Sequence, residues 1–307
     1  ASQIVLSEVT EEKRAMKAFI VANYASGVGK CALFMPTVER VLQKENIEYS
    51  VFRTVDKETD IRTVRENINN CDVLICLGGD GTVNEVINAA LAESSKTPIG
   101  YIPCGSTNDF ATNYSLPTNP GKAMKRILEM NAKPIDVGCL NGRYFCYVAA
   151  AGAFSEVSYA TKREKKRFFG KAAYLLEGAR SVPKIKPISL HVETDGETFE
   201  GKYLICTFSN SSRIGGIFHF AKGMVDYSDG KMELALIEDP GNAPDLLLLL
   251  HDLVKGNFQN RCIRIVRTDR VRITSDSEIA WSLDGEYGGS YRETDLFALN
   301  RRFILLC

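Results

Sequence analysis

Three glycines and an aspartate among five consecutive residues, Gly78-Gly79-Asp80-Gly81-Thr82, form the stretch of this chain with the clearest chemical potential. Glycine adopts positive φ at little cost and lets another molecule approach the main chain closely. The apolar residues 73–77 before it predict a strand buried on both faces. We expect Thr82 to open a helix, with Glu85 completing a Thr-x-x-Glu capping box. A glycine loop that leads into a helix N-terminus favours an anionic ligand, above all phosphate.

Asp80 is unusual in such a loop, because its carboxylate repels a phosphate unless a cation lies between them or the residue handles a proton. Carboxylate and phosphate oxygens are the ligands that Mg²⁺ accepts. We therefore predict that the loop binds nucleotide phosphates, with Mg²⁺ near Asp80. The alternative interpretation is an ordinary tight turn in which Asp80 is solvated.

A second glycine loop, at residues 23–30, lies between an apolar run typical of a buried strand and a helical pattern of apolar residues. Its Gly29-Lys30 pair does not complete a Walker P-loop. Tyr24 occupies the position of the first Walker glycine, and Cys31 replaces the hydroxyl residue that would bind Mg²⁺.

Residues 103–111 form a third glycine loop, which follows a strand predicted at residues 99–102 and contains a weaker capping box from Ser106 to Asp109. The alternation of strands and helices predicts a parallel, doubly wound sheet. In such a sheet ligands bind at the carboxyl ends of the strands, where the three loops gather. The other elements predicted in this α/β domain are strands at 18–22 and 48–53 and a helix at 61–68.

The character of the chain changes near residue 134, where strands begin to outnumber helices. Asn141-Gly142 predicts the turn of a hairpin formed by residues 135–140 and 143–149. We therefore expect an α/β nucleotide-binding domain over residues 1–134 and a β-sandwich lipid-substrate domain over residues 135–291. Further strands are predicted at 188–193, 199–209, 232–237, 262–267, 271–274 and 279–283.

The bulk composition is that of an ordinary globular protein of 307 residues with a formal net charge of zero, so it gives no argument for nucleic-acid binding. Nine cysteines without a CxxC pair favour a reducing, cytoplasmic location. Residues 1–17 predict no signal-peptide core. The longest apolar run, at residues 246–250, is too short to span a bilayer, and it predicts a helix packed in the core.

Several of these motifs resemble those of one enzyme family. Gly78–Thr82 is similar to a motif shared by lipid kinases of the diacylglycerol kinase catalytic type, by NAD kinases and, with small changes, by phosphofructokinases. Gly105–Ala111 resembles the lipid-kinase pattern Gly-Thr-x-Asn-Asp-Phe-Ala, and Asn23–Gly27 resembles Asn-Pro-x-Ser-Gly with Tyr24 in place of proline. Leu283–Glu286 matches the family's Leu-Asp-Gly-Glu. The resemblance covers residues 18–289 and points to bacterial soluble lipid kinases, which are related to sphingosine kinases.

The resemblance implies that residues 292–307 return to pack on the first domain. It also implies a Mg²⁺ away from the reaction, held by Asp226, Asp229 and the backbone oxygen of Lys231; a plain Asp-Gly turn is the alternative there. The nucleotide-binding residues that it implies are Asn23, Ser26, Gly27, Thr54, Gly78, Gly79, Asp80, Gly81, Thr82, Asn84, Glu85, Thr107, Asn108 and Asp109.

By the same resemblance, the enzyme transfers the γ-phosphoryl group of ATP to a lipid hydroxyl, most simply that of diacylglycerol, giving phosphatidic acid. A lipid hydroxyl needs a carboxylate to accept its proton. Asp284 or Glu286 can be this base, and we predict Asp284; Asp80 acts in catalysis through Mg²⁺. The alternatives are an NAD kinase and a catalytically inactive lipid-binding or regulatory protein.

A lipid kinase without a membrane-spanning segment must visit the membrane surface, so we expect a peripheral protein at the inner membrane surface. The sequence leaves the oligomeric state open, and a homodimer is one arrangement that it allows. Residues 162–171 contain six basic residues, one acid and two phenylalanines. This basic segment could dock on an anionic membrane, or it could be a solvated helix face.

Overall fold

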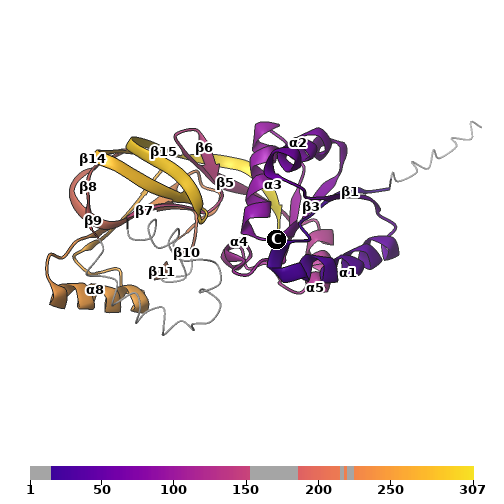
Figure 1. The fold of residues 1–307 in the computed structure, drawn as a ribbon, viewed down its shortest axis with the longest axis horizontal. Helices are drawn as coiled ribbons and strands as arrows, with labels where there is room; N and C mark the ends of the chain where they lie inside the picture. The colour runs from indigo at the N-terminus through magenta and orange to yellow at the C-terminus, as the bar shows by residue number, and fades with distance from the viewer. Residues whose placement is uncertain (1–14, 153–185, 215–217, 220–224) are drawn as a thin grey trace, which may run out of the picture.

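The computed structural model describes residues 15–152, 186–214, 218–219 and 225–307. It has an α/β domain and a strand-rich domain, which lie side by side and share one sheet (Figure 1). The basic segment at residues 162–171 lies outside the described residues. Within the described part of the chain, no helix is long and apolar enough to cross a membrane.

The α/β domain is built on four parallel strands in the order β4-β3-β1-β2. Alternate residues of β1 face opposite cores, Phe19 and Val21 on one side and Ile20 on the other. Helices α2 and α3 cover the first face and α1 and α5 the second, which confirms the doubly wound sheet (Figure 1). The elements are β1 Lys17–Ala22, α1 Lys30–Lys44, β2 Glu48–Arg53, α2 Lys57–Asn67, β3 Val73–Gly78, α3 Asp80–Ala92, β4 Ile99–Pro103, α4 Asp109–Asn113 and α5 Pro120–Leu128, with short 3₁₀ helices at Ser26–Gly29 and Ile68–Asn70.

The helices begin at other residues than the sequence predicts. Helix α3 starts at Asp80, because Gly79 is extended (φ −95°, ψ −174°) and itself occupies the N-cap position. The predicted Thr82–Glu85 capping box is therefore wrong. The Ser106–Asp109 box is wrong too, since Asn108 at φ 52° precedes α4 without a side-chain cap. Helix α2 starts at Lys57 rather than at residue 61. The side chain of its N-cap residue, Asp56, accepts a hydrogen bond from the Thr59 N–H.

The strand-rich domain forms a curved sheet around a second core. Strands β7 and β8 lie end to end between β9 and β14, and both pair antiparallel with each of them. The turn predicted at Asn141-Gly142 is confirmed, and it joins β5 and β6. The predicted second strand of the hairpin, at residues 143–149, is divided, because β6 ends at Phe145 and Val148 begins β7, which pairs with β9 and β14. The strands are β5 Ala132–Leu140, β6 Arg143–Phe145, β7 Val148–Gly152, β8 Ile188–Thr194, β9 Thr198–Ser209, β10 Arg213–Ile214, β11 Phe218–His219, β12 Met232–Glu238, β13 Ile263–Thr268, β14 Arg270–Leu283 and β15 Glu286–Leu306, and helix α8 spans Ala243–Lys255.

Two predictions for this domain need correction. The separate strands at 271–274 and 279–283 are one strand, β14, with an irregularity between Thr274 and Ile279. The leucine run at 246–250 is helical, as predicted, but it is not packed in the core on all sides. Leu249 is 1% exposed, whereas Leu247 and Leu248 are 64% and 55% exposed.

Strand β15 connects the two domains. Its first part, up to Phe297, pairs with β14, its second part, from Leu296 on, pairs with β5, and Leu305 pairs with Ile99 of β4 in parallel. The end of the chain thus lies in the sheet of the α/β domain. The domain boundaries at residues 134 and 291 stay a prediction, because the sheet is continuous across them.

Val28, between two left-handed glycines, has φ 58° and is 77% exposed. The left-handed region costs a residue with a Cβ atom about 1–2 kcal/mol. We therefore expect Val28→Gly to raise the free energy of unfolding, measured in urea, by about 1 kcal/mol after the entropy cost of glycine. Asn46→Gly, at φ 52°, is the matched control and should gain less, because asparagine tolerates this conformation. Equal effects at both positions would contradict the strain at Val28.

Candidate active site

The three glycine loops meet at the carboxyl ends of β1, β3 and β4. A Cβ atom on Gly79 would lie 3.0 Å from Ser26 Oγ and 3.4 Å from Gly105 Cα. A Cβ atom on Gly27 would overlap the carbonyl oxygen of Cys104. Glycine is therefore required at Gly27, where the loop at residues 23–30 meets the loop at 103–111, and a side chain at Gly79 would be crowded by both of these loops. The backbones of all three loops form one surface.

Asp80 joins the loop at residues 78–82 to the loop at residues 103–111. One carboxylate oxygen accepts from the Thr107 hydroxyl (3.0 Å) and the other from the Phe110 N–H (3.0 Å). Gly81 follows in the first turn of α3, where an added Cβ atom would meet no atom of the described residues within 4 Å. The N-terminus of α3 thus opens onto free space beside a carboxylate that is held in place.

Most of the other predicted nucleotide-binding residues lie in the glycine loops or beside them. Asn23 donates to the Thr82 hydroxyl (3.0 Å), so these two residues tie the loop at residues 23–30 to α3. Thr54 follows β2 at the same edge, and its N–H donates to the Ala22 carbonyl. Four more predicted residues, Gly78, Thr107, Asn108 and Asp109, lie at the end of β3 or in the third loop.

Asn84 and Glu85 lie farther along α3. The Asn84 side chain donates to Asp284 Oδ2 (2.7 Å), which gives it a structural partner in the strand-rich domain. Burial chiefly raises the pKa of Glu85; Lys57 opposes the rise, and the Asp60 and Glu286 charges add to it. Because Asn84 holds Asp284 against α3, Glu286, two residues farther along the chain, also lies near this helix.

Asp284 is the centre of a buried hydrogen-bond network. Its Oδ2 accepts from Asn84 and from the Cys146 N–H (2.6 Å), and its Oδ1 accepts from the N–H groups of Tyr147 and Val148 (both 3.0 Å). Burial raises the pKa of the Asp284 carboxyl, while the four N–H donors oppose that rise. Each oxygen already accepts two hydrogen bonds, and the side chain is buried.

Asp284 as the general base stays a prediction, and this environment argues against it. A base must reach the substrate hydroxyl with a free lone pair, whereas the Asp284 oxygens are buried and already accept four hydrogen bonds. Asp284 and Gly285, at φ 50° and 88°, instead form the two-residue turn between β14 and β15. The exposed Glu286 comes directly after this anchored turn.

Tyr147 is a site residue that the sequence did not indicate. Its hydroxyl donates to the Asp284 carbonyl (3.2 Å). Burial raises its pKa most, and the charges of Asp284, Asp80 and Asp109 raise it further. The Tyr147 N–H also donates to Asp284 Oδ1 (3.0 Å), so Tyr147 binds both the backbone and the side chain of Asp284. No local motif marks Tyr147, because its role depends entirely on residues distant in sequence.

The predicted metal turn is held by its own hydrogen bonds. Asp226 accepts from the Ser228 N–H, and Asp229 accepts from the Lys231 N–H and forms an ion pair with Arg267. In the described part of the chain, no group of three or more His, Cys, Asp or Glu side chains is arranged around a possible metal ion. Nearby, burial raises the pKa of Glu233 to about 7, and both of its carboxylate oxygens lack a hydrogen-bond partner among the described residues.

Comparison with known proteins identifies the family. Residues 17–140 match the diacylglycerol kinase catalytic domain, and residues 148–295 match the YegS C-terminal NAD kinase beta sandwich-like domain. Together these matches cover most of the chain. The chain belongs to the diacylglycerol kinase family. A diacylglycerol kinase from Staphylococcus saprophyticus is 32% identical over 278 residues, which are 89% of this chain and 90% of that protein.

Other members of the diacylglycerol kinase family agree. The Bacillus subtilis diacylglycerol kinase is 29% identical over 278 residues, which are 89% of this chain and 90% of that protein. A diacylglycerol kinase structure from Bacillus anthracis shares the fold with a TM-score of 0.72, at 18% identity, and covers 96% of this chain and 98% of its own. These findings confirm the predicted family, the α/β domain followed by a β-sandwich-like domain, and the prediction that the protein is a kinase.

Proposed function

We propose that this enzyme transfers the γ-phosphoryl group of ATP to the hydroxyl of diacylglycerol, with Glu286 as the general base. The names of the curated relatives support the acceptor. The observation that carries the assignment of the base is the saturated Asp284 carboxylate, which anchors the turn and leaves the adjacent, exposed Glu286 close to α3.

ATP phosphates fit best against the surface formed by the three glycine loops. The N-terminus of α3 offers N–H groups and a positive dipole end, and the position beside Gly81 is open. Ser26, Thr107 and Asn23 border this surface, so they are the side chains that we expect to contact the nucleotide. We expect Thr54 and Asn108 to contact the nucleotide as well, whereas Asn84 holds Asp284.

Mg²⁺ fits between the phosphates and the acids at this edge. Asp80 accepts from the Phe110 N–H (3.0 Å), and Phe110 follows Asp109 directly, so two acidic residues lie close together. One or two carboxylates plus phosphate oxygens are the usual ligands of Mg²⁺. The ion would neutralise charge on the phosphates. A second Mg²⁺ at Asp226, Asp229 and Lys231 stays a prediction, and Arg267 would have to release Asp229 for it to bind.

The chain's own residues then have separate tasks. The loops hold the triphosphate, and Asp284 and Tyr147 fix the turn. Glu286 accepts the proton of the lipid hydroxyl while the hydroxyl oxygen attacks the γ-phosphorus, and the bond from the γ-phosphorus to the bridging oxygen breaks, so that ADP leaves. The enzyme would work at the membrane surface, at the inner membrane if the chain is cytoplasmic, and a homodimer stays a prediction. Incubation with ATP and either diacylglycerol micelles or NAD tests the acceptor: we expect phosphorylation of the lipid alone.

Gly81→Ala tests the phosphate site without disturbing the fold. We expect ATP affinity, measured by calorimetry, to fall roughly tenfold, because the methyl group enters the open space where phosphate binds. The free energy of unfolding should rise by about 0.5–1 kcal/mol, since alanine favours helix over glycine. Gly121→Ala, also at the second residue of a helix, is the matched control. Unchanged ATP affinity in Gly81→Ala would place the phosphates elsewhere.

A further inference from the structure

We propose that Cys31 and Cys104 form a dithiol that hydrogen peroxide oxidises to a disulfide directly beneath the glycine loops. Cys31 lies in the first turn of α1, and Cys104 lies in the loop at residues 103–111. Formation of the disulfide does not depend on what the enzyme phosphorylates. Its effect on ATP rests on the proposed function, because that function places the phosphates against the same loops.

The two cysteines come together at the carboxyl ends of β3 and β4. Cys31 Sγ lies 3.6 Å from the carbonyl oxygen of Leu77, and Cys104 Sγ lies 3.4 Å from that of Ile102. Leu77 and Ile102 are paired residues of neighbouring strands, which are about 4.8 Å apart. Both cysteines are fully buried in the same core, and the two thiols are in hydrogen-bond contact. A bond between the sulfurs therefore needs only a small movement.

Cys31 has the properties of the sulfur that reacts first. It is the second residue of α1, and the N-terminus of a helix stabilises a thiolate. A hydrogen bond from the Cys104 thiol lowers the pKa of Cys31 most; burial opposes this shift, and the Asn23 N–H lowers the pKa further. Lys30 and Ala32, on either side of Cys31, are exposed, so Cys31 lies just below the surface of the α/β domain.

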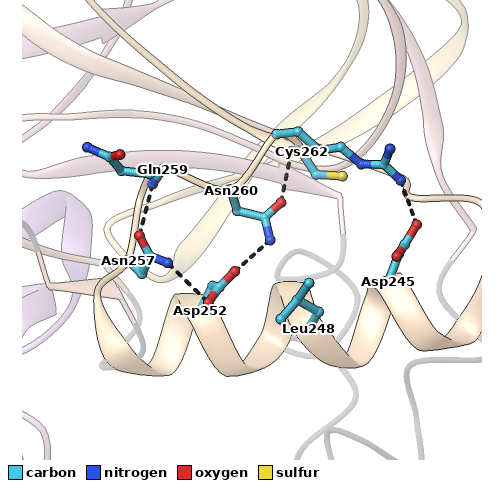
Figure 2. Close-up of a pocket in the computed structure, with 8 residues that line it drawn as sticks. Asp245, Leu248, Asp252, Asn257, Gln259, Asn260 and Cys262 are labelled. Atoms are coloured by element: carbon cyan, nitrogen blue, oxygen red, sulfur yellow. Dashed lines mark hydrogen bonds and ion pairs between the residues drawn. The ribbon is translucent and has the colours of Figure 1, made fainter.

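Three other cysteines show what this pair has in addition. Burial raises the pKa of the Cys71 thiol to about 11 and that of Cys76 well above its ordinary value, so both stay protonated. Cys76 also faces the core on the other side of β3. Figure 2 shows Cys262 in a shallow pocket of about 240 Å³ beside α8, where it is the one sulfur-containing residue of the lining. Peroxide that reaches Cys262 finds no second thiol in this pocket, whereas Cys31 has one in contact.

The reaction balances with one molecule of hydrogen peroxide. The Cys31 thiolate attacks one peroxide oxygen, the O–O bond breaks, and the hydroxide that leaves is protonated to water, so that the sulfur becomes a sulfenic acid. The Cys104 sulfur then attacks the sulfenic sulfur, the S–O bond breaks, and the leaving hydroxide takes the Cys104 proton as a second water. In total the two thiols lose two electrons and two protons, and the peroxide is reduced to two waters.

The disulfide alters the surface on which we place the ATP phosphates. A disulfide bond is about 2.05 Å long, much shorter than a contact between two thiols. The loops cannot simply move together, because Gly27 already packs against the Cys104 carbonyl, where a Cβ atom would overlap the oxygen. The backbone of Gly105, which follows Cys104, must therefore shift. Gly105 packs against Gly79, the N-cap residue of α3, so the change reaches the end of the helix where we expect phosphate to bind.

Treatment of the full chain with hydrogen peroxide tests the disulfide itself. We expect the mass of the protein to fall by two hydrogens, and digestion to give one cross-linked peptide that contains Cys31 and Cys104. Dithiothreitol should reverse both changes. No cross-link, a cross-link between other cysteines, or sulfinic acid at Cys31 in place of the disulfide would overturn the proposal.

Calorimetry with ATP tests the effect on the nucleotide site. The affinity of the unmodified protein should fall roughly tenfold or more on oxidation, since groups that bind the phosphates are displaced, and dithiothreitol should restore it. In Cys31→Ser the affinity should be the same before and after peroxide; Cys31→Ala makes the same comparison if the serine variant does not fold. Cys71→Ser, which replaces a thiol 3.3 Å from the Ile68 carbonyl oxygen, is the matched control and should respond as the unmodified protein does.

The same measurements separate the failure of this inference from the failure of the proposed function. An equal loss of ATP affinity in the Cys31 variants and the unmodified protein would overturn the inference, because another oxidation would then be responsible. So would a cross-linked protein that binds ATP as tightly as the reduced one, and if Gly81→Ala also leaves ATP affinity unchanged, the proposed phosphate site fails with it. If the cross-link forms and weakens ATP binding but no lipid is phosphorylated, the proposed acceptor fails and this inference stands.

Discussion

Glu286→Gln is expected to lower kcat by roughly 10²–10⁴ and to leave ATP affinity nearly unchanged, which is the effect of removing a positioned general base. Glutamine keeps the size of the side chain but cannot accept the proton of the lipid hydroxyl. Because Glu286 is exposed and follows a turn that Asp284 anchors, the substitution should not change the melting temperature. Steady-state kinetics with diacylglycerol micelles and calorimetry with ATP measure the two effects.

Glu293→Gln is the matched control for this experiment. It makes the same change at another exposed glutamate of β15, seven residues farther along the strand. Its kcat should stay at the level of the unmodified enzyme. If Glu286→Gln keeps kcat within about threefold of that level, far less than a general base contributes, Glu286 is not the base, and Asp80 becomes the leading candidate.

Asp284→Asn is expected to lower the free energy of unfolding by about 3 kcal/mol or more, because the amide NH₂ group would face buried N–H donors. Two of those donors come from Cys146 and Asn84, which hold the strand-rich domain and α3 against the turn. For a protein of this size the loss corresponds to a melting temperature lower by about 6–12 °C. Differential scanning calorimetry measures the shift.

The stability of Asp284→Asn separates its two possible roles. If Asp284 anchors the turn, its substitution lowers stability and kcat together, whereas Glu286→Gln lowers only kcat. An Asp284→Asn protein that melts like the unmodified enzyme but has lost kcat would restore Asp284 as the base. The comparison needs both variants under the same conditions, with ATP absent during the melting experiment.

The sequence predicts much of the α/β domain because its determinants are local. The β3 run Val73–Gly78 is apolar throughout, and all six of its residues are buried. The glycine loops are equally local, since each follows a strand and precedes a helix or 3₁₀ turn. What the sequence did not supply is the helix start at Asp80, which depends on the extended backbone of Gly79 rather than on a side-chain cap.

The acid pair at the β14–β15 turn shows why the site was harder to predict. Asp284 and Glu286 are two residues apart and equally acidic, so local pattern cannot assign their roles. Their environments differ because the partners of Asp284 are 136 to 200 residues away in the sequence. The leucine run of α8 has the same limit: its composition predicts a helix, but which leucines face the core depends on how that helix docks.

The central claim is tested most directly by identifying the phosphorylated product by mass. Labelled ATP with Mg²⁺ is supplied to the enzyme together with diacylglycerol, other lipid alcohols and NAD, each in a separate reaction. The account predicts phosphatidic acid from diacylglycerol, and a yield lower by roughly 10²–10⁴ with Glu286→Gln at equal ATP occupancy. Phosphorylation of NAD with no lipid product, or an undiminished lipid product from Glu286→Gln, would contradict it.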